Sequence, residues 1–271
     1  MPELPEVKVV AKSLEQTIKN QKIIDIKIIN EKFIKEINAQ DFINAIINQT
    51  IINVSNYGKF ILIFLSNKKV ILSHLRMEGK YTIIQNKIFP KHTYLIFKFE
   101  SGWYLCYSDS RMFGTFHLRE LENYNKIPPL SKLAKTPEQS DVNEIFLKFQ
   151  KKNIAIKSAL LDQSLVVGLG NIYVNEALWA AQINPTRSAK SISKKELSLI
   201  LEHSTRIMDA SFALGGSSIL SYESLNSQKG SYQNFLQVHT KQNKPCSRCN
   251  NLISKIKVNG RGTYYCAFCQ K

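Results

Sequence analysis

The sequence contains no long apolar segment and no export signal. No run of about 18 apolar residues, the length of a membrane-spanning helix, occurs among its 271 residues. Its first residues carry neither the basic nor the apolar stretch of a signal peptide, so we expect a cytoplasmic protein with no membrane partner. Repeats and low-complexity tracts are also missing. Since 44% of the residues are hydrophobic, the composition disfavours disorder, collagen and coiled coil, and the length suits two domains with their own cores.

Acidic residues are the scarcer charged class. The chain has 21 Asp and Glu residues against 37 Lys and Arg residues, which leaves a formal net charge of +16. Such an excess favours a polyanionic partner, first a nucleic acid and second an acidic membrane surface. The charge alone leaves open the alternative that the lysines simply keep the protein soluble.

The N-terminal half combines one helical pattern with many short strand patterns. Apolar residues at helical spacing predict a helix over residues 5–20 that begins at Pro5. Turn clusters then separate β-branched and aromatic runs, which favours a β-sandwich or a flattened barrel. The predicted strands are 22–30, 50–56, 60–65, 70–75, 94–99, 103–107 and 115–118, with one short helix at 41–47.

Helical patterns dominate after a proline-containing segment at 125–137, which is the best candidate for a linker. We expect helices at 141–151, 154–163, 172–182 and 194–214, the last of them ended by Gly215 and Gly216. The predicted fold class is therefore α+β. The predicted domains are an N-terminal β-sandwich at 1–130, a helical domain at 131–236 and a zinc finger at 237–271.

Four of the five cysteines have the spacing of a metal site, Cys246-x2-Cys249-x16-Cys266-x2-Cys269. This spacing is typical of a zinc ribbon, in which two knuckles each supply two thiolates to one structural Zn2+. Two disulfides are the alternative, which a cytoplasmic location disfavours. The fifth cysteine, Cys106, lies in an apolar strand and is interpreted as a core residue.

Residues 255–265, between the two cysteine pairs, alternate as a β-hairpin with Arg261 at its tip. The glycines on either side of Arg261 would let the tip approach a phosphate backbone closely. A solvated turn arginine is the alternative, but a basic hairpin beside a zinc site favours nucleic-acid contact.

Six motifs occur from the first residue to the last in the order typical of one enzyme family. They are Met1-Pro2-Glu3-Leu4-Pro5-Glu6-Val7, Asn56-Tyr57-Gly58-Lys59, His74-Leu75-Arg76-Met77-Glu78-Gly79, Asp109-Ser110-Arg111-Met112-Phe113-Gly114, Gly168-Leu169-Gly170-Asn171-Ile172-Tyr173 and the cysteine ribbon. In order and spacing they resemble the bacterial formamidopyrimidine-DNA glycosylases, also called 8-oxoguanine DNA glycosylase/AP lyases. The resemblance implies a helix–two-turns–helix element in the helical domain, damaged double-stranded DNA as the partner, a monomer and one zinc ion.

The resemblance gives the N-terminus a catalytic role that elementary chemistry supports. An α-amine has a pKa of about 7.7–8.0, against about 10.4 for lysine, so an appreciable fraction is neutral and nucleophilic at neutral pH. Pro2 becomes such an amine once Met1 is removed, and it would form a charged iminium at the sugar C1′. The roles implied for the other residues are general acid or base for Glu3, sugar orientation for Glu6, proton donation for Lys59 and δ-elimination for Arg261. Without the resemblance, Pro2, Glu3 and Glu6 would be read as ordinary helix-start residues and Lys59 as a strand-edge lysine.

The resemblance also implies a set of DNA contacts. Met77, Arg111 and Phe113 are expected to fill the gap left when the damaged base leaves the stack, although Met77 and Phe113 alone would suit a core. The expected phosphate contacts are His92, Lys59, Arg111, Asn171 and Arg261, together with the Lys151-Lys152-Asn153 region. The expected pocket residues are Tyr173, Glu176, Ser217 and Tyr222, the last two in a segment that resembles the family's lesion loop. The chain departs from the common pattern at Ser110-Arg111-Met112, where relatives often carry Pro-Arg-Arg, and at Asn153, where many carry lysine. Packing is the competing interpretation for Tyr173 and Glu176.

We therefore expect a bifunctional DNA repair enzyme that removes 8-oxoguanine and formamidopyrimidines and then cuts the strand by β,δ-elimination. One alternative is an endonuclease VIII-like glycosylase for oxidised pyrimidines. Another is a non-catalytic zinc-ribbon DNA-binding protein whose N-terminus is only structural.

Overall fold

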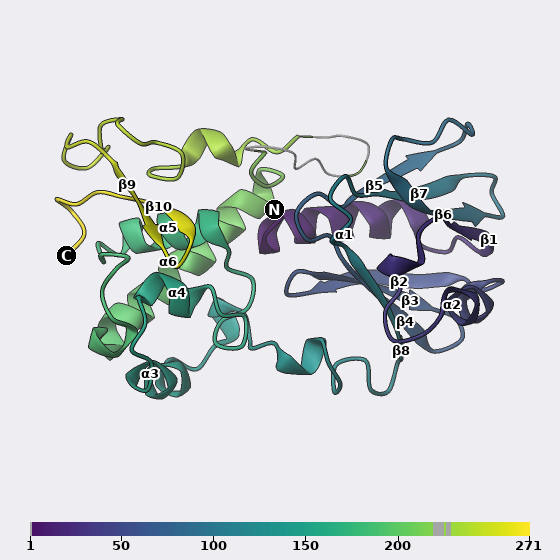
Figure 1. The fold of residues 1–271 in the computed structure, drawn as a ribbon, viewed down its shortest axis with the longest axis horizontal. Helices are drawn as coiled ribbons and strands as arrows, with labels where there is room; N and C mark the ends of the chain where they lie inside the picture. The colour runs from purple at the N-terminus through teal and green to yellow at the C-terminus, as the bar shows by residue number, and fades with distance from the viewer. Residues whose placement is uncertain (1, 219–224, 226–228) are drawn as a thin grey trace. The chain divides into compact units, whose positions relative to one another are not determined.

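The computed structural model describes residues 2–218, 225 and 229–271, and the chain forms two compact units (Figure 1). The first unit consists of Met1–Ser131 and Leu214–Ser231, and the second of Lys132–Ala213 and Tyr232–Lys271. The segment that follows the last long helix therefore belongs to the first unit, and the chain passes between the units three times. In the part of the chain that the structure describes, no helix is both long and apolar enough to cross a membrane.

Helix α1, Leu4–Ile18, opens the first unit and confirms the helix predicted at 5–20. It begins with a capping box, because the Glu3 side chain accepts the N–H of Glu6 and the Glu6 side chain accepts the N–H of Glu3. Pro5 occupies the first turn, where a missing N–H costs nothing. The apolar face of α1, which includes Val7 and Leu14, is buried in the core.

The first unit also contains two four-stranded antiparallel sheets, as the predicted sandwich requires, and α1 enters between them (Figure 1). One sheet has the order β1-β6-β7-β5, with β1 at Ile23–Ile28, β6 at Thr93–Phe99, β7 at Tyr104–Ser108 and β5 at Lys80–Ile84. The other has the order β2-β3-β4-β8, with β2 at Ile51–Tyr57, β3 at Phe60–Leu65, β4 at Lys69–His74 and β8 at Thr115–Glu120. Helix α2, Ala39–Ile46, and the 3-10 helix η1, Glu31–Phe33, lie between β1 and β2 in the sequence. Strand β5 is absent from the predicted set.

The second unit is helical and carries one β-hairpin. Its helices are α3 at Val142–Gln150, α4 at Ile156–Leu160, α5 at Asn171–Ala180 and α6 at Lys194–Ala213. Its short 3-10 helices lie at Pro137–Gln139, Ala189–Ser191 and Tyr232–Phe235, and another, Leu130–Lys132, spans the boundary between the units in the sequence. The predicted hairpin is confirmed, with β9, Ser254–Val258, paired to β10, Arg261–Tyr265. Helix α5 is buried along most of its length and packs against both α6 and β10.

Candidate active site and nucleic-acid interface

Glu3 and Glu6 form a buried carboxylate pair at the start of α1, with 2% and 1% of their surfaces exposed. The Oε2 atom of Glu6 accepts the N–H of Glu3 at 2.8 Å, and its Oε1 atom accepts the N–H of Ser217 at 2.8 Å. The positive end of the helix dipole favours negative charge at this position. The Glu6 carboxylate therefore links Glu3 to Ser217, in the segment that follows α6. Three predicted site residues, Glu3, Glu6 and Ser217, lie together.

The two ends of the segment after α6, at residues 214–218 and 230–231, pack closely against each other through their backbones. A side chain at Gly230 would place its first carbon 2.1 Å from the carbonyl oxygen of Gly216, so only glycine fits there. The N–H of Gly230 donates to Ser218 Oγ at 2.9 Å, and the N–H of Ser231 donates to the carbonyl of Leu214 at 3.0 Å. The buried hydroxyl of Ser217 has no hydrogen-bond partner among the described residues. Tyr222, the other residue predicted for this segment, lies outside the described residues.

Lys59 lies in the tight turn between β2 and β3, where Gly58 has a positive φ of 54°. The lysine is 7% exposed, and the next residue, Phe60, packs edge-on against His74 with ring centroids 4.6 Å apart. Burial, reinforced by the positive charges of Arg76 and Lys59, lowers the pKa of His74 to about 3. A neutral His74 can accept the N–H of Arg76 at Nδ1, as the 2.9 Å distance indicates. Sequence reasoning gave His74 no role.

Asp109 organises the turn that carries Arg111 and Phe113, two of the residues expected to fill the gap left by the damaged base. Its carboxylate is 1% exposed and accepts the backbone N–H groups of Arg111 at 3.0 Å, Phe113 at 3.0 Å and Gly114 at 2.8 Å. Both Arg111 and Phe113 remain exposed, and the Arg111 guanidinium lies 4.8 Å from the centre of the Phe113 ring. The turn therefore presents one cation and one aromatic ring to the solvent. Asp109 is a supporting residue that the sequence analysis quoted but did not assign.

Three other residues near the predicted interface, His92, Met112 and Met77, differ in how far they are exposed. Exposed His92 lies beside the turn that Asp109 organises, because its carbonyl accepts the N–H of Asp109 at 3.0 Å. Met112 has a φ of 54° and packs against the core of the first unit, so the position where relatives often carry arginine presents no charge here. Met77 is half-buried in the separate turn between β4 and β5, which the hydrogen bond from Gly79 N–H to Leu75 O closes at 2.9 Å.

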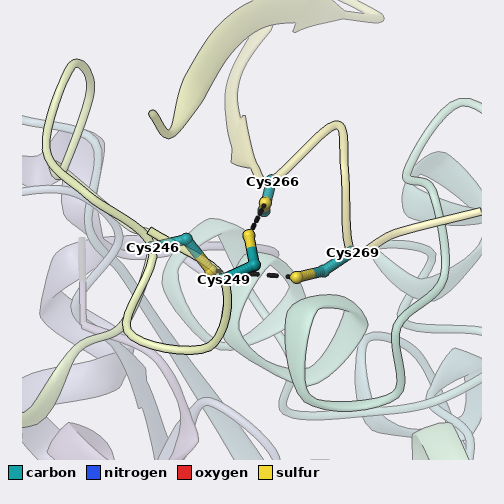
Figure 2. A group of neighbouring side chains, drawn as sticks. All are labelled: Cys246, Cys249, Cys266 and Cys269. Carbon is teal, nitrogen blue, oxygen red and sulfur yellow. Dashed lines mark hydrogen bonds between the residues drawn. The ribbon is translucent and has the colours of Figure 1, made fainter. Parts of the chain in front are cut away.

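The four predicted metal ligands lie together in the second unit (Figure 2). All four Sγ atoms are within 4.8 Å of one another; Cys246 and Cys269 are 4.0 Å apart, and Cys249 and Cys266 are 3.5 Å apart. Zinc–sulfur bonds of about 2.3 Å in a tetrahedron require sulfur–sulfur distances of about 3.8 Å. The donor set and its spacing therefore fit one structural Zn2+, as the sequence predicted.

A buried lysine supports the hairpin next to Arg261. Lys157, in α4, is 0% exposed, and its Nζ donates to Gly262 O at 3.0 Å and to Thr263 Oγ1 at 2.7 Å. Asn171 Nδ2 donates to the same Gly262 carbonyl at 3.1 Å. Arg261 itself is exposed at the first position of β10. The structure thus places Asn171 on the residue that follows Arg261, while the tip of the hairpin is Asn259-Gly260. Lys157, like His74 and Asp109, is a residue to which sequence reasoning gave no role.

The remaining predicted residues of the second unit have structural partners. Glu176 accepts the N–H groups of 237, 238 and 239 at 2.7 to 3.0 Å, and burial raises its pKa. The Tyr173 hydroxyl contacts Ser211 Oγ at 2.6 Å. Lys152 pairs with Asp162 at 2.9 Å, and exposed Asn153 accepts a long hydrogen bond of 3.4 Å from Ser188. These contacts explain the burial of Tyr173 and Glu176 without a ligand.

Three family models match successive parts of the chain, and they define a class of zinc-finger DNA glycosylases. The formamidopyrimidine-DNA glycosylase N-terminal domain matches residues 1–116, the H2TH domain of the same enzyme matches 133–223, and a zinc finger found in FPG and IleRS matches 243–271. The implied helix–two-turns–helix element and the zinc finger are therefore confirmed as domains of this class.

Similar proteins extend over the whole chain. The formamidopyrimidine-DNA glycosylase of Mycoplasma mobile is 53% identical over 100% of this chain and 99% of its own, and that of Mycoplasmopsis pulmonis is 49% identical over 100% and 98%. A mutant of the Lactococcus lactis FPG, crystallised with DNA containing Fapy-dG, is 37% identical with a TM-score of 0.94, and the match covers 100% of each chain. The L. lactis enzyme bound to DNA containing an abasic site gives the same identity, coverage and TM-score. The chain belongs to the formamidopyrimidine-DNA glycosylase family.

Proposed function

We propose that this protein is a bifunctional DNA glycosylase and AP lyase of base excision repair that removes oxidised purines from duplex DNA. The observation that carries the proposal is the arrangement at the start of α1, where Pro2 directly precedes the buried, hydrogen-bonded pair Glu3 and Glu6. The names of the relatives and the damaged DNA bound in the L. lactis structures support the same substrate class.

In the proposed reaction, Pro2 is the nucleophile after Met1 has been removed. Its secondary amine forms a bond to the sugar C1′ as the N-glycosidic bond breaks, and the base leaves with a proton. The sugar ring then opens to give an iminium between Pro2 and C1′, which acidifies the C2′ proton. Glu3 transfers protons at the sugar, and Glu6 holds Glu3 in place through the 2.8 Å bond to its N–H.

Strand cleavage follows from that iminium by two eliminations. Loss of the C2′ proton breaks the C3′–O bond, and a second elimination breaks the C5′–O bond. Water then hydrolyses the C1′–N bond, which frees the sugar fragment and Pro2, so that a one-nucleotide gap remains. Lys59 is proposed to donate a proton in the first elimination. Arg261 is proposed to act in the second chiefly by contacting phosphate, because a guanidinium stays charged at all relevant pH values.

The DNA-facing residues are assigned from the family resemblance, and the exposure of His92, Arg111 and Phe113 agrees with it. We assign Met77, Arg111 and Phe113 to the gap left by the flipped base, and the phosphate contacts to His92, Lys152, Asn153 and Asn171. Tyr173, Glu176, Ser217 and Tyr222 remain the proposed pocket set, of which Ser217 has the strongest support because its buried hydroxyl lacks a partner among the described residues. The protein is proposed to act as a cytoplasmic monomer.

Cleavage of lesion-containing oligonucleotides with analysis of the DNA ends tests the proposal. Wild-type protein should cut 8-oxoguanine opposite cytosine in preference to thymine glycol, leave phosphate at both ends of the gap, and form a borohydride-trapped adduct at Pro2. Pro2→Gly should abolish the adduct, and Glu3→Gln should abolish base release. Glu31→Gln, a change at an exposed glutamate of the same unit, should alter neither. Unchanged strand cleavage in both active-site variants would refute the chemistry, and a preference for thymine glycol would refute the substrate class.

A further inference from the structure

The C-terminal end of α5 contacts the first zinc knuckle through one tryptophan. The indole Nε1 of Trp179 donates to Cys246 Sγ at 3.4 Å. Indole nitrogen is a donor only, so the sulfur is its acceptor. Cys246 is 0% exposed, so this bond lies in a place where hydrogen bonds to charged groups are strong.

Arg248, inside the same knuckle, also contacts this tryptophan. Its guanidinium carbon lies 4.2 Å from the centre of the Trp179 ring. Its NH1 and NH2 atoms donate to the carbonyls of Trp179 at 3.0 Å and of Ala180 at 3.5 Å. These carbonyls belong to the last turn of α5, where a cation meets the negative end of the helix dipole.

The negative charge of a zinc site with four thiolates explains why N–H donors beside the sulfurs are favourable. Four thiolates around one Zn2+ carry a net charge of −2, and N–H donors that point at the sulfurs offset it. Trp179 supplies such a donor to Cys246, and Asn251 Nδ2 supplies one to Cys249 at 3.5 Å. The donor from Trp179 comes from a helix outside the finger, whereas Asn251 belongs to the finger itself.

Helix α5 contacts the finger at its other end as well. Asn171, its first residue, donates to Gly262 O, next to Arg261. The helix is therefore held at one end by the hairpin and at the other by the first knuckle.

We propose that Trp179 is a positioning residue that ties the zinc thiolate Cys246 to helix α5, with Arg248 holding its ring, so that metal binding fixes this helix as well as the finger. The occupant of the site is the zinc ion that the four cysteines fit. The inference does not depend on the glycosylase reaction, and its failure would leave the proposed function untouched.

The variant Trp179→Phe tests the proposal in the full-length, metal-loaded protein, because phenylalanine keeps the ring under Arg248 and removes the N–H. We expect the zinc affinity, measured by competition with a chelating dye, to fall about tenfold, the size typical for loss of an outer-shell partner. In the Co2+-substituted protein, the sulfur-to-metal charge-transfer band should move to lower energy. Trp103→Phe, the matched change at the exposed tryptophan of the first unit, should alter neither value. A Trp179→Phe protein that matches Trp103→Phe in both measurements overturns the proposal.

A second measurement avoids any change at Trp179. In the Trp103→Phe protein, Trp179 is the single remaining tryptophan, and its fluorescence should change when a chelator removes zinc and return when zinc is added back. Emission that is independent of zinc overturns the proposal even if the Trp179→Phe protein does not fold.

Discussion

Replacement of Asp109 by asparagine should damage both the stability of the first unit and its ability to open DNA. Oδ2 of Asp109 accepts the N–H groups of Phe113 and Gly114, and Oδ1 accepts that of Arg111. Asparagine keeps one acceptor oxygen, so even the orientation that preserves both bonds of Oδ2 places an NH2 group against the part-buried N–H of Arg111. That orphaned N–H costs about 1–3 kcal/mol, and each of the two surviving bonds loses about 1 kcal/mol of charge assistance, which gives about 3–5 kcal/mol in total.

Urea unfolding followed by circular dichroism measures that loss, with Ser110→Ala, a change at the exposed neighbour, as the control. The same variant should lose base excision from an intact duplex more than it loses borohydride trapping at an abasic site in a single strand. The reason is that the turn carries Arg111 and Phe113 but none of the residues proposed for the covalent step. A free energy of unfolding within about 0.5 kcal/mol of wild type would refute the reasoning about the carboxylate, since that is the range of ordinary surface changes.

Three further perturbations probe other parts of the molecule. Burial first, and then the charges of Arg76 and Lys59, lower the pKa of His74 from 6.5 to about 3, so the unfolded chain binds an extra proton between these values. Stability should fall as the pH drops through that window, and His74→Phe should flatten the fall in pH-dependent urea titrations; an equal slope would contradict the assignment. Lys157→Met removes an ammonium that the hairpin needs and should lower δ-elimination about tenfold relative to β-elimination in end-group analysis, whereas Lys257→Met, on the exposed side of β9, should not. Arg261→Ala should reduce the slope of log K against log salt for DNA binding by about one, and an unaltered slope would place this arginine away from phosphate.

Local patterns in the sequence predicted the elements that depend on local physics. The helical spacing from Val7 to Ile18 predicted α1, and the spacing of the cysteines predicted the metal cluster. Each pattern could be recognised because its residues follow one another at a characteristic spacing in a short stretch of the sequence. Strand β5 was missed because it is an edge strand in which only Tyr81 is fully buried, so it has no buried apolar face for the sequence to show.

Partnerships between distant residues were the part that the sequence could not supply. Lys157 and Thr263 are separated by 106 positions, and nothing around Lys157 distinguishes it from the many solvated lysines of the chain. Glu176 was predicted to line a pocket, and the structure shows both of its oxygens on backbone N–H groups more than 60 residues away. Asp109 offered a usable signal, since an aspartate that opens a turn often accepts the N–H groups that follow it.

The path of the chain between the two units limits how the protein can be divided. Three family domains in succession suggest modules that could be expressed or exchanged separately. A fragment that ends at Ser131, however, would lack Ser217, whose N–H satisfies Glu6, and Leu225, which belongs to the core of the first unit. The surroundings of the N-terminal carboxylates are thus encoded in two separate stretches of the gene. Truncation or exchange at the boundary of the N-terminal family domain would therefore remove the N–H of Ser217 from Glu6.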